Sequence, residues 1–293
     1  MITTMSADGT SVRAADQGRG PVILIVHPGL DDGRSWRKVA ARLAPRFRVV
    51  RLRRRQYRLD LTTGLPCTIA QEAGDVLAVT KVIGEPVLIV GHSSGGVVAL
   101  EALAASPATF PGAVLYEPPV VTGPPLGGDA VGRAQAAIAA GRPGRAMTIF
   151  LRDVVQIPAP AARLAGTVVA VHPRWRALIP RQIDDAAAIN QLGVRLGAYA
   201  RIEVPVVLLG GERSPAHLGA RLGALADALP HAERVVLPRE GHGAHLQAPG
   251  DVAPRHRVPG RPGAAGGGFR ALMARAGVVA SWAWRHTSCG RPG

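Results

Sequence analysis

The sequence predicts an α/β fold with a mostly parallel sheet that is flanked by helices and carries a helical cap inserted between strands. Short, wholly apolar runs such as Val22–His27 and Val87–Val90 are typical of buried parallel strands. They alternate with segments of about 10–15 residues that have helical spacing, which indicates βαβ units. Residues 120–200 contain only helical patterns, and the alternation resumes at Pro205–Leu209. This interruption predicts the cap.

The composition indicates a globular chain with an aliphatic core. Of the 293 residues, 47% are hydrophobic but only 4% are aromatic, so a sizeable core can form and global disorder is excluded. The formal net charge is +15, and residues 253–293 contribute seven Arg with no Asp or Glu. This stretch is rich in Gly and Pro and loses the helical period, so we expect a disordered tail there. Because much of the charge lies in this tail, we expect no nucleic-acid partner.

The first half of the chain predicts four strands and three helices in alternation. After Val22–His27, residues 34–44 have helical spacing and Phe47–Leu52 is a second apolar run. Thr68 is a suitable N-cap for a helix that ends near Val82. The elements that follow are a strand at Val87–Val90, a helix at Ser94–Ala105 and a further strand at Gly112–Tyr116.

The second half predicts a strand at Pro205–Leu209, a helix at Ala216–Leu229 and a strand at Arg234–Leu237. We therefore assign residues 1–119 and 201–252 to the core. Residues 120–200 form the expected cap and residues 253–293 the expected tail.

Several functional classes are not indicated. The two cysteines, Cys67 and Cys289, are far apart and form no metal-binding motif, so neither a disulfide framework nor a metal site is predicted. No apolar run reaches the roughly 18 residues that would predict a membrane span. The first twenty residues lack the apolar stretch of a signal peptide. We expect a cytoplasmic protein that acts on a small molecule without a cofactor and without a membrane partner.

The segment Gly91-His-Ser93-Ser-Gly95 is the strongest chemical signal in the sequence. It matches the pattern G-x-S-x-G, follows an apolar strand and opens a helix, which is the context that a nucleophilic serine requires. The two glycines are needed because side chains there would collide with the neighbouring strand and helix. We interpret Ser93 as a nucleophile rather than as part of an ordinary Gly-rich turn.

A serine hydroxyl needs a general base to attack at neutral pH, and His242 is the candidate. It lies in a loop just after the strand Arg234–Leu237, so it faces the same edge of the sheet as Ser93. His245 is the alternative, but three residues later it is expected to enter the following helix.

With these motifs, and with a His27-Pro28-Gly29 loop after the first apolar run, residues 9–252 resemble the α/β-hydrolase fold superfamily. The resemblance implies a catalytic triad and an oxyanion hole. One oxyanion N–H would come from Ser94, after the nucleophile. The other would come from Gly29, with Leu30 in reserve, because Pro28 has no N–H to donate.

The acid of the triad departs from the family pattern. Relatives usually carry an Asp after the strand that is Pro205–Leu209 here, but this chain has Ser214 at that position. Glu117, at the end of the strand Gly112–Tyr116, can replace it, since some relatives place their acid there. Glu212 is a second candidate, and the absence of any acid is a third possibility.

The segment Arg51–Arg58 contains five Arg in eight residues near the expected active-site edge. It could clamp a carboxylate or phosphate of a substrate, since Arg binds both groups bidentately. We favour a solvated basic loop whose arginines pair with Asp60, Glu72 or acidic residues of the cap.

Together these observations predict a serine hydrolase that acts on a carboxylic ester, thioester or lactone through an acyl-enzyme on Ser93, with His242 as base. The alternative is a non-catalytic protein that binds a small ligand on the same fold. The missing Asp at position 214 favours this alternative, and the presence of both Ser93 and His242 argues against it.

Overall fold

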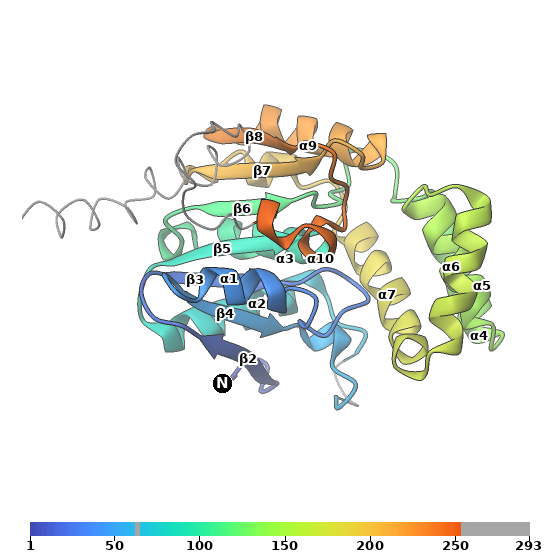
Figure 1. The fold of residues 1–293 in the computed structure, drawn as a ribbon, viewed down its shortest axis with the longest axis horizontal. Helices are drawn as coiled ribbons and strands as arrows, with labels where there is room; N and C mark the ends of the chain where they lie inside the picture. Colours follow the sequence, from blue (N-terminus) through green and yellow to red (C-terminus); the bar gives the residue numbers. More distant parts are fainter. Residues whose placement is uncertain (62–64, 253–293) are drawn as a thin grey trace, which may run out of the picture.

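The computed structural model describes residues 1–61 and 65–252, and within them eight strands form one sheet in the order β1-β2-β4-β3-β5-β6-β7-β8 (Figure 1). The strands are β1 (Ile2–Met5), β2 (Ser11–Gln17), β3 (Val22–Val26), β4 (Arg48–Arg53), β5 (Val87–His92), β6 (Ala113–Tyr116), β7 (Val206–Gly211) and β8 (Ala232–Leu237). Strand β2 pairs antiparallel with β1 and β4, and all other pairs are parallel. The predicted α/β fold with a mostly parallel sheet is thus confirmed.

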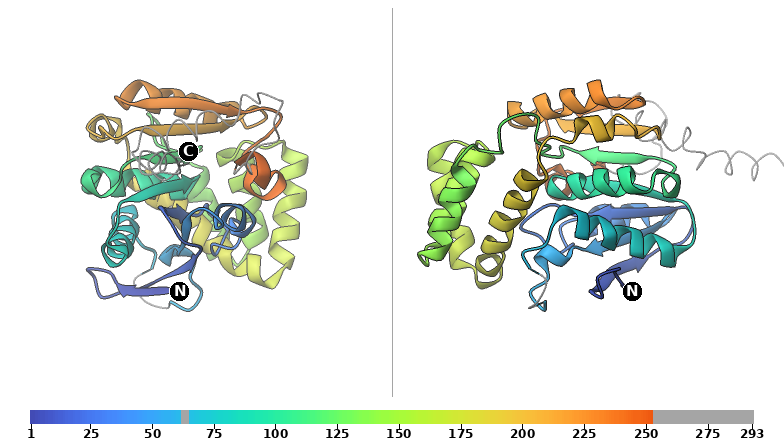
Figure 2. Two further views of the ribbon diagram at one scale, coloured as in Figure 1. Left: turned by 60° about the vertical axis from the view of Figure 1, so that its left-hand side comes forward. Right: turned by 180° about the vertical axis from the view of Figure 1, so that it is seen from behind.

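The helices cover both faces of the sheet, as the opposite views of Figures 1 and 2 show. One face carries α2 (Ile69–Ile83), α3 (Ser94–Ala105), α8 (Leu196–Tyr199) and α9 (Ala216–Ala228). The other carries α1 (Arg37–Leu43) and two short C-terminal helices, α10 (Ala244–Gln247) and α11 (Pro249–Val252). The expected tail, residues 253–293, lies outside the described residues.

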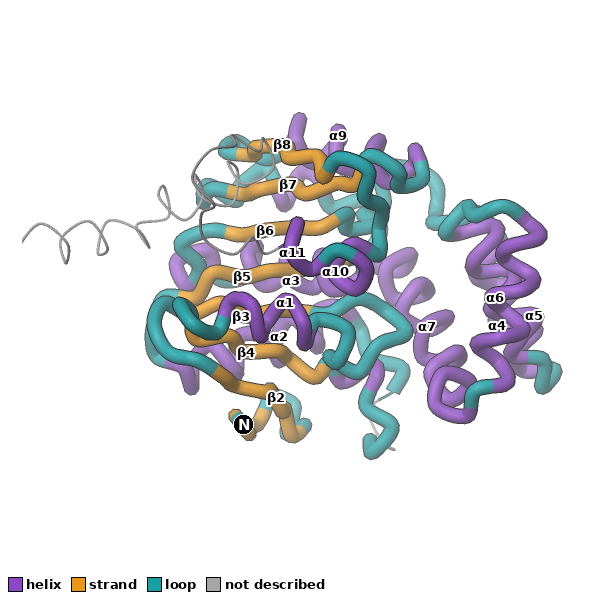
Figure 3. Tube along the Cα trace, in the orientation of Figure 1, coloured by secondary structure: helices purple, strands orange, loops and turns teal. Residues whose placement is uncertain are grey.

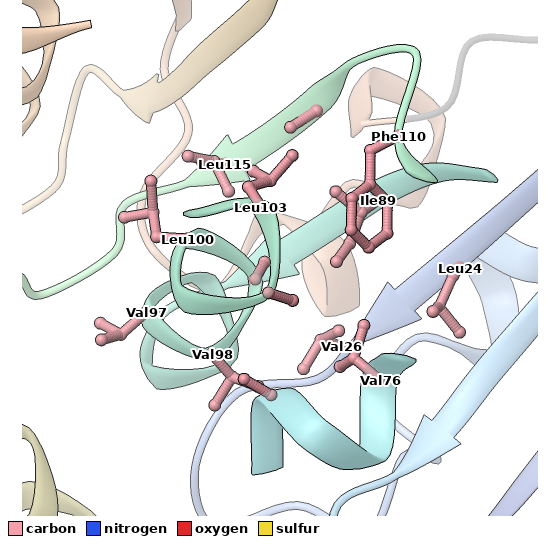
Figure 4. Packing of buried hydrophobic residues seen from close by; sticks show 14 of the residues in the cluster. Leu24, Val26, Val76, Ile89, Val97, Val98, Leu100, Leu103, Phe110 and Leu115 are labelled. Carbon is pink, nitrogen blue, oxygen red and sulfur yellow. The ribbon is translucent and has the colours of Figure 1, made fainter. Parts of the chain in front are cut away.

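Helix α3 is buried along most of its length, and this burial fixes the strand-to-helix turn in front of it. Figure 4 shows Leu100 and Leu103 packed against Ile89 of β5 and Leu115 of β6. All four side chains are fully buried. A methylene group moved from water into such a core contributes about 0.8 kcal/mol. The first turn of α3 is therefore held firmly against the carboxyl end of β5.

Helix α2 begins where the sequence predicts it, because Thr68 caps its first turn. The Thr68 hydroxyl accepts from the N–H of Gln71, and the Gln71 side chain accepts from the N–H of Thr68. This reciprocal pair satisfies two N–H groups that a helix start leaves free. The helix ends at Gly84, which has a left-handed φ of 69°.

The segment between β6 and β7 forms a helical layer beyond the carboxyl ends of the parallel strands. It contains α4 (Ala130–Ala139), α5 (Pro143–Ile149), a π-helical turn (Phe150–Val154), α6 (Ala159–Val171) and α7 (Pro173–Leu192). Helix α7 lies between the sheet and the other cap helices (Figure 1). Figure 3 shows the loops that follow the strands gathering at the edge of the sheet that faces α7.

Two strands were not predicted. The hairpin β1–β2 lies in a polar stretch that lacks a continuous apolar run, but in β2 only alternate residues, Val12 and Ala14, are buried. An antiparallel edge with one solvated face needs only this alternation. Its burial comes from packing against β4 and α2, which local composition does not reveal.

Candidate active site

Ser93 occupies the sharp turn between β5 and α3. Its φ of 53° lies in the left-handed region, which a residue with a side chain adopts only under constraint. Two glycines make the turn possible. A Cβ on Gly91 would lie 2.6 Å from the Cα of Gly96, and a Cβ on Gly95 would overlap the carbonyl oxygens of Val26 and His27. The predicted reason for both glycines is therefore confirmed.

Glu117 and His242 meet beside Ser93, although 125 residues separate them in sequence. The Nδ1 atom of His242 lies 2.6 Å from Oε2 of Glu117. The other carboxylate oxygen, Oε1, accepts a 2.7 Å hydrogen bond from the N–H of Gly211. Because the Glu117 side chain is 1% exposed and that of His242 is 29% exposed, the acid is buried behind an imidazole that reaches the cavity.

The geometry follows from strand order. Parallel pairing sets His92, which precedes the serine, opposite Tyr116, which precedes the glutamate. The N–H of Ser93 donates to the carbonyl of Tyr116, and the N–H of Glu117 donates to that of Leu209. Glu117 also has a left-handed φ, of 46°. Adjacent strands thus deliver the serine and the carboxylate side by side.

Three buried side chains hold the backbone of the His242 loop. The hydroxyl of Tyr116 donates to the carbonyl of Gly241, and Nε2 of His92 lies 3.1 Å from the carbonyl of His242. The indole N–H of Trp36 donates to Nδ1 of His92, so His92 must carry its proton on Nε2. Burial lowers the pKa of His92 well below its usual value, which keeps it in this neutral form. Sequence reasoning assigned no role to these residues.

The competing residues take other positions. Glu212 is exposed and accepts from the backbone N–H of Arg239, so it does not reach His242. The Ser214 hydroxyl is buried without a hydrogen-bond partner among the described residues. His245 enters α10, as predicted, and its ring stacks on Trp36 at 5.4 Å.

The two expected oxyanion-hole segments also border this site. Ser94 is the first residue of α3, so its backbone N–H has no partner within the helix. Gly29 and Leu30 lie in the loop after β3, where Leu30 has a left-handed φ of 52°. All three residues line the same cavity as Ser93 and His242.

That cavity has a volume of about 630 Å³ and lies between the sheet and the cap. Its walls are mostly apolar, with Leu126, Met147, Phe150, Leu151, Val154, Val155, Val169, Trp175, Leu178 and Ile189 among the lining residues. Its charged lining residues are Asp31, Arg34 and Arg174. Asp31 accepts from the Ser35 hydroxyl at 2.6 Å, while Arg34 and Arg174 both pair with Asp32, at 3.4 and 2.5 Å. Such a volume suits a small organic molecule.

The Arg51–Arg58 segment differs from the favoured prediction. Its arginines do pair with Asp60, Glu72 and the cap residue Asp185, but Arg54, Arg55 and Arg58 are buried rather than solvated. The loop runs under the cap instead of over the surface. Since Arg54 is saturated by these partners, it is also unavailable as a clamp for an anionic substrate.

The described part of the chain contains no group of three or more His, Cys, Asp or Glu side chains arranged to hold a metal ion. None of its helices is both long and apolar enough to cross a membrane.

Comparisons with known proteins agree with this architecture. A family model described as "Alpha/beta hydrolase family" matches residues 23–255. An alpha/beta hydrolase from Sphaerobacter thermophilus DSM 20745 is 29% identical and superposes with a TM-score of 0.71, covering 82% of this chain and 94% of that one.

Two more distant structures share the fold. Est816, described as an N-acyl homoserine lactone degrading enzyme, is 22% identical with a TM-score of 0.66, covering 86% of this chain and 97% of its own. The esterase EaEST from Exiguobacterium antarcticum is 19% identical with a TM-score of 0.66, covering 84% and 93%.

Proposed function

The chain belongs to the alpha/beta hydrolase family, and from this premise we propose that it is a serine hydrolase that cleaves an ester-like bond through an acyl-enzyme on Ser93. The observation that carries the proposal is the 2.6 Å contact between His242 Nδ1 and Glu117 Oε2 beside a strained serine. A structural histidine would not need a buried carboxylate on one nitrogen and an open cavity on the other. The esterase and lactone-degrading relatives are consistent with this chemistry.

The steps follow from the hydrogen bonds. Because Nδ1 of His242 donates to Glu117, Nε2 is free to take the proton of the Ser93 hydroxyl as its oxygen attacks the substrate carbonyl. The imidazolium then gives this proton to the leaving alcohol, thiol or ring oxygen. Water, activated by the same nitrogen, attacks the acyl-enzyme and releases the carboxylic acid. Glu117 keeps the required tautomer and stabilises the transient positive charge.

The oxyanion of each tetrahedral intermediate would be held by two backbone N–H groups, those of Ser94 and Gly29. Ser94 stands at the N-terminus of α3, where the helix dipole adds to the effect. Leu30 is the reserve for the second donor. Losing one such donor in a related mechanism lowers kcat about 10²–10³-fold.

The cavity indicates the class of substrate. Its mostly apolar walls favour a molecule with an apolar acyl or alcohol group.

The test is covalent labelling of the purified protein with a fluorophosphonate probe. We expect one label per chain in the parent protein and in Ser214→Ala, and none in Ser93→Ala. Ser214 is a matched control because its hydroxyl is buried without a hydrogen-bond partner in the described part of the chain and lies outside the cavity lining. If a folded parent protein remains unlabelled, the enzymatic proposal is wrong, and a ligand-binding protein on this fold becomes the better explanation.

A further inference from the structure

We propose that Arg54 is a positioning residue that ties both arms of the oxyanion hole to the cap helix α7. This inference rests on the proposed serine-hydrolase function. It assigns a role in the proposed active site to a residue that contacts neither the substrate nor the reacting atoms. From the sequence we expected this residue on a solvated loop.

The guanidinium of Arg54 is saturated. Its side chain is 0% exposed, and its five N–H groups have five acceptors. Nε and Nη2 bind the Glu72 carboxylate at 3.1 and 2.5 Å. Nη2 also donates to Asp185 at 2.8 Å, and Nη1 donates to the Ser94 hydroxyl at 2.7 Å and to the His27 carbonyl at 3.3 Å. Five contacts of one planar guanidinium group thus fix the relative positions of the four chain segments that carry these acceptors.

The first arm of the oxyanion hole is held through Ser94. Its side-chain oxygen accepts from Arg54, while its backbone N–H is the donor that the oxyanion would use. Because side chain and N–H belong to the same residue, the guanidinium restrains the position of that N–H. Ser94 is itself buried, so this contact is not exchanged with solvent.

The second arm is held through His27. Nε2 of His27 accepts from the backbone N–H of Arg54 at 3.2 Å, so Nδ1 carries the proton and donates to the Pro28 carbonyl at 2.8 Å. Burial lowers the pKa of His27, which is consistent with this neutral tautomer. Backbone and side chain of Arg54 thus both hold the residue that leads into Pro28-Gly29.

The cap helix completes the arrangement. Asp185 of α7 binds Arg54 through Oδ1 and accepts from the Tyr57 hydroxyl through Oδ2 at 2.6 Å. The hydroxyl oxygen of Tyr57 also lies 3.2 Å from the side-chain oxygen of Gln182 in α7. A Cβ on Gly29 would collide with the side chain of this same Gln182. The cap helix therefore reaches the oxyanion loop both directly and through Arg54.

The charge balance explains why arginine occupies this position. Burial disfavours its charge, but Asp185 and Glu72 raise the pKa of Arg54 well above its usual value, so the cation persists. A lysine would supply three donors from a single atom and could not span the carboxylates, the hydroxyl and the carbonyl together. Arg54→Lys thus keeps the charge and loses the geometry.

The consequence is specific to the transition state. If the Ser94 and Gly29 N–H groups shift, the oxyanion loses stabilisation while the bound substrate is little affected. We expect Arg54→Lys to lower kcat by about 10–100-fold, with KM changed by less than about threefold. The affinity for a trifluoromethyl ketone, which forms a tetrahedral adduct with the serine, should fall by the same factor as kcat.

Arg55 provides a matched control. It is the next residue, it is also buried, and it pairs with Asp75 and Asp8, but it has no hydrogen bond with Ser94 or the His27 loop. Arg55→Lys therefore removes a comparable buried guanidinium group that makes no contact with the proposed oxyanion hole. Its kcat should stay within about threefold of the parent even where its melting temperature falls as far as that of Arg54→Lys.

Ser94→Ala keeps the test decisive if Arg54→Lys does not fold. It retains the backbone N–H and removes only the contact with Arg54, so kcat should fall about tenfold at unchanged KM. In a folded double variant the two losses should be less than additive.

The proposal is overturned if kcat in Ser94→Ala and in both arginine variants only follows melting temperature, or if KM rises as kcat falls. A parent protein without labelling at Ser93 would instead overturn the proposed function.

Discussion

Replacing Glu117 by Gln tests the proposed acid without changing the shape of the buried side chain. In the parent, Oε1 accepts from the N–H of Gly211 and Oε2 accepts from Nδ1–H of His242. The amide oxygen of Gln must stay on the Gly211 N–H, because an amide NH₂ there would meet another donor. The NH₂ group then faces His242, whose Nδ1 must become the acceptor. Nε2 consequently carries the proton and cannot receive that of Ser93.

The magnitude follows from two effects. A carboxylate and an imidazolium whose charges lie about 4 Å apart attract by about 4 kcal/mol at an effective dielectric of 20. Since about 1.4 kcal/mol corresponds to a factor of ten in rate, losing this attraction should lower kcat by a factor of about 10³. The wrong tautomer of His242 lowers the rate further. In a serine protease, a neutral residue at the position of the acid lowers kcat by about 10⁴. We expect kcat of Glu117→Gln to fall by about 10³–10⁴.

The assay is hydrolysis of p-nitrophenyl butyrate, followed with the rate of fluorophosphonate labelling. Glu212→Gln is the control, because that carboxylate is exposed and binds only the backbone of Arg239 among the described residues. It should retain kcat within about twofold. If folded Glu117→Gln keeps more than about a tenth of the parent kcat, Glu117 is not the acid and the reasoning from these two hydrogen bonds is refuted.

Three further predictions concern stability and specificity. Burial lowers the pKa of His245 to about 4 from an ordinary value near 6.5. The unfolded chain therefore binds the proton first, and the free energy of unfolding should fall by up to about 3 kcal/mol as pH drops from about 6.5 to 4. Denaturant titrations should show this fall flattened in His245→Phe; an unchanged slope would contradict the assignment. Val155→Trp fills part of the cavity beside the half-buried π-helical turn. Its kcat/KM for an octanoyl ester should drop more than about tenfold relative to that for an acetyl ester; equal losses on both esters would exclude this cavity as the acyl site. Gly91→Ala places a methyl group against Gly96 and Ala99, whereas Gly74→Ala in α2 meets only the Ser6 hydroxyl at 3.7 Å. Gly91→Ala should lower the free energy of unfolding by about 1–3 kcal/mol and Gly74→Ala raise it by up to about 1 kcal/mol; destabilisation of both would show that the turn is not the special site.

Sequence patterns predicted an element correctly where the interactions that fix it span only a few residues. The helix Ser94–Ala105 has the predicted bounds, and Thr68 caps α2 as expected. The hairpin β1–β2 escaped prediction because its burial depends on β4 and α2, which are distant in sequence.

The position of the acid illustrates the same limit. The residues alone left Glu117, Glu212 and no acid open, because local sequence does not say which loop end turns toward the histidine. The structure brings only Glu117 of these two to His242, since β6 lies between β5 and β7 and a left-handed backbone aims the side chain inward.

The order of residues along the chain was enough to predict the α/β class, the strand-to-helix turn at Ser93 and the cap insertion between strands. Each of these features follows from the spacing of hydrophobic residues, or from the steric need for glycine, among residues that are close together in the sequence. The environment of the segment Arg51–Arg58, by contrast, became clear only from the packing of the folded chain. Whether a guanidinium is solvated or buried depends on what packs over it, and here Glu72 and Asp185 arrive from positions 18 and 131 residues away from Arg54.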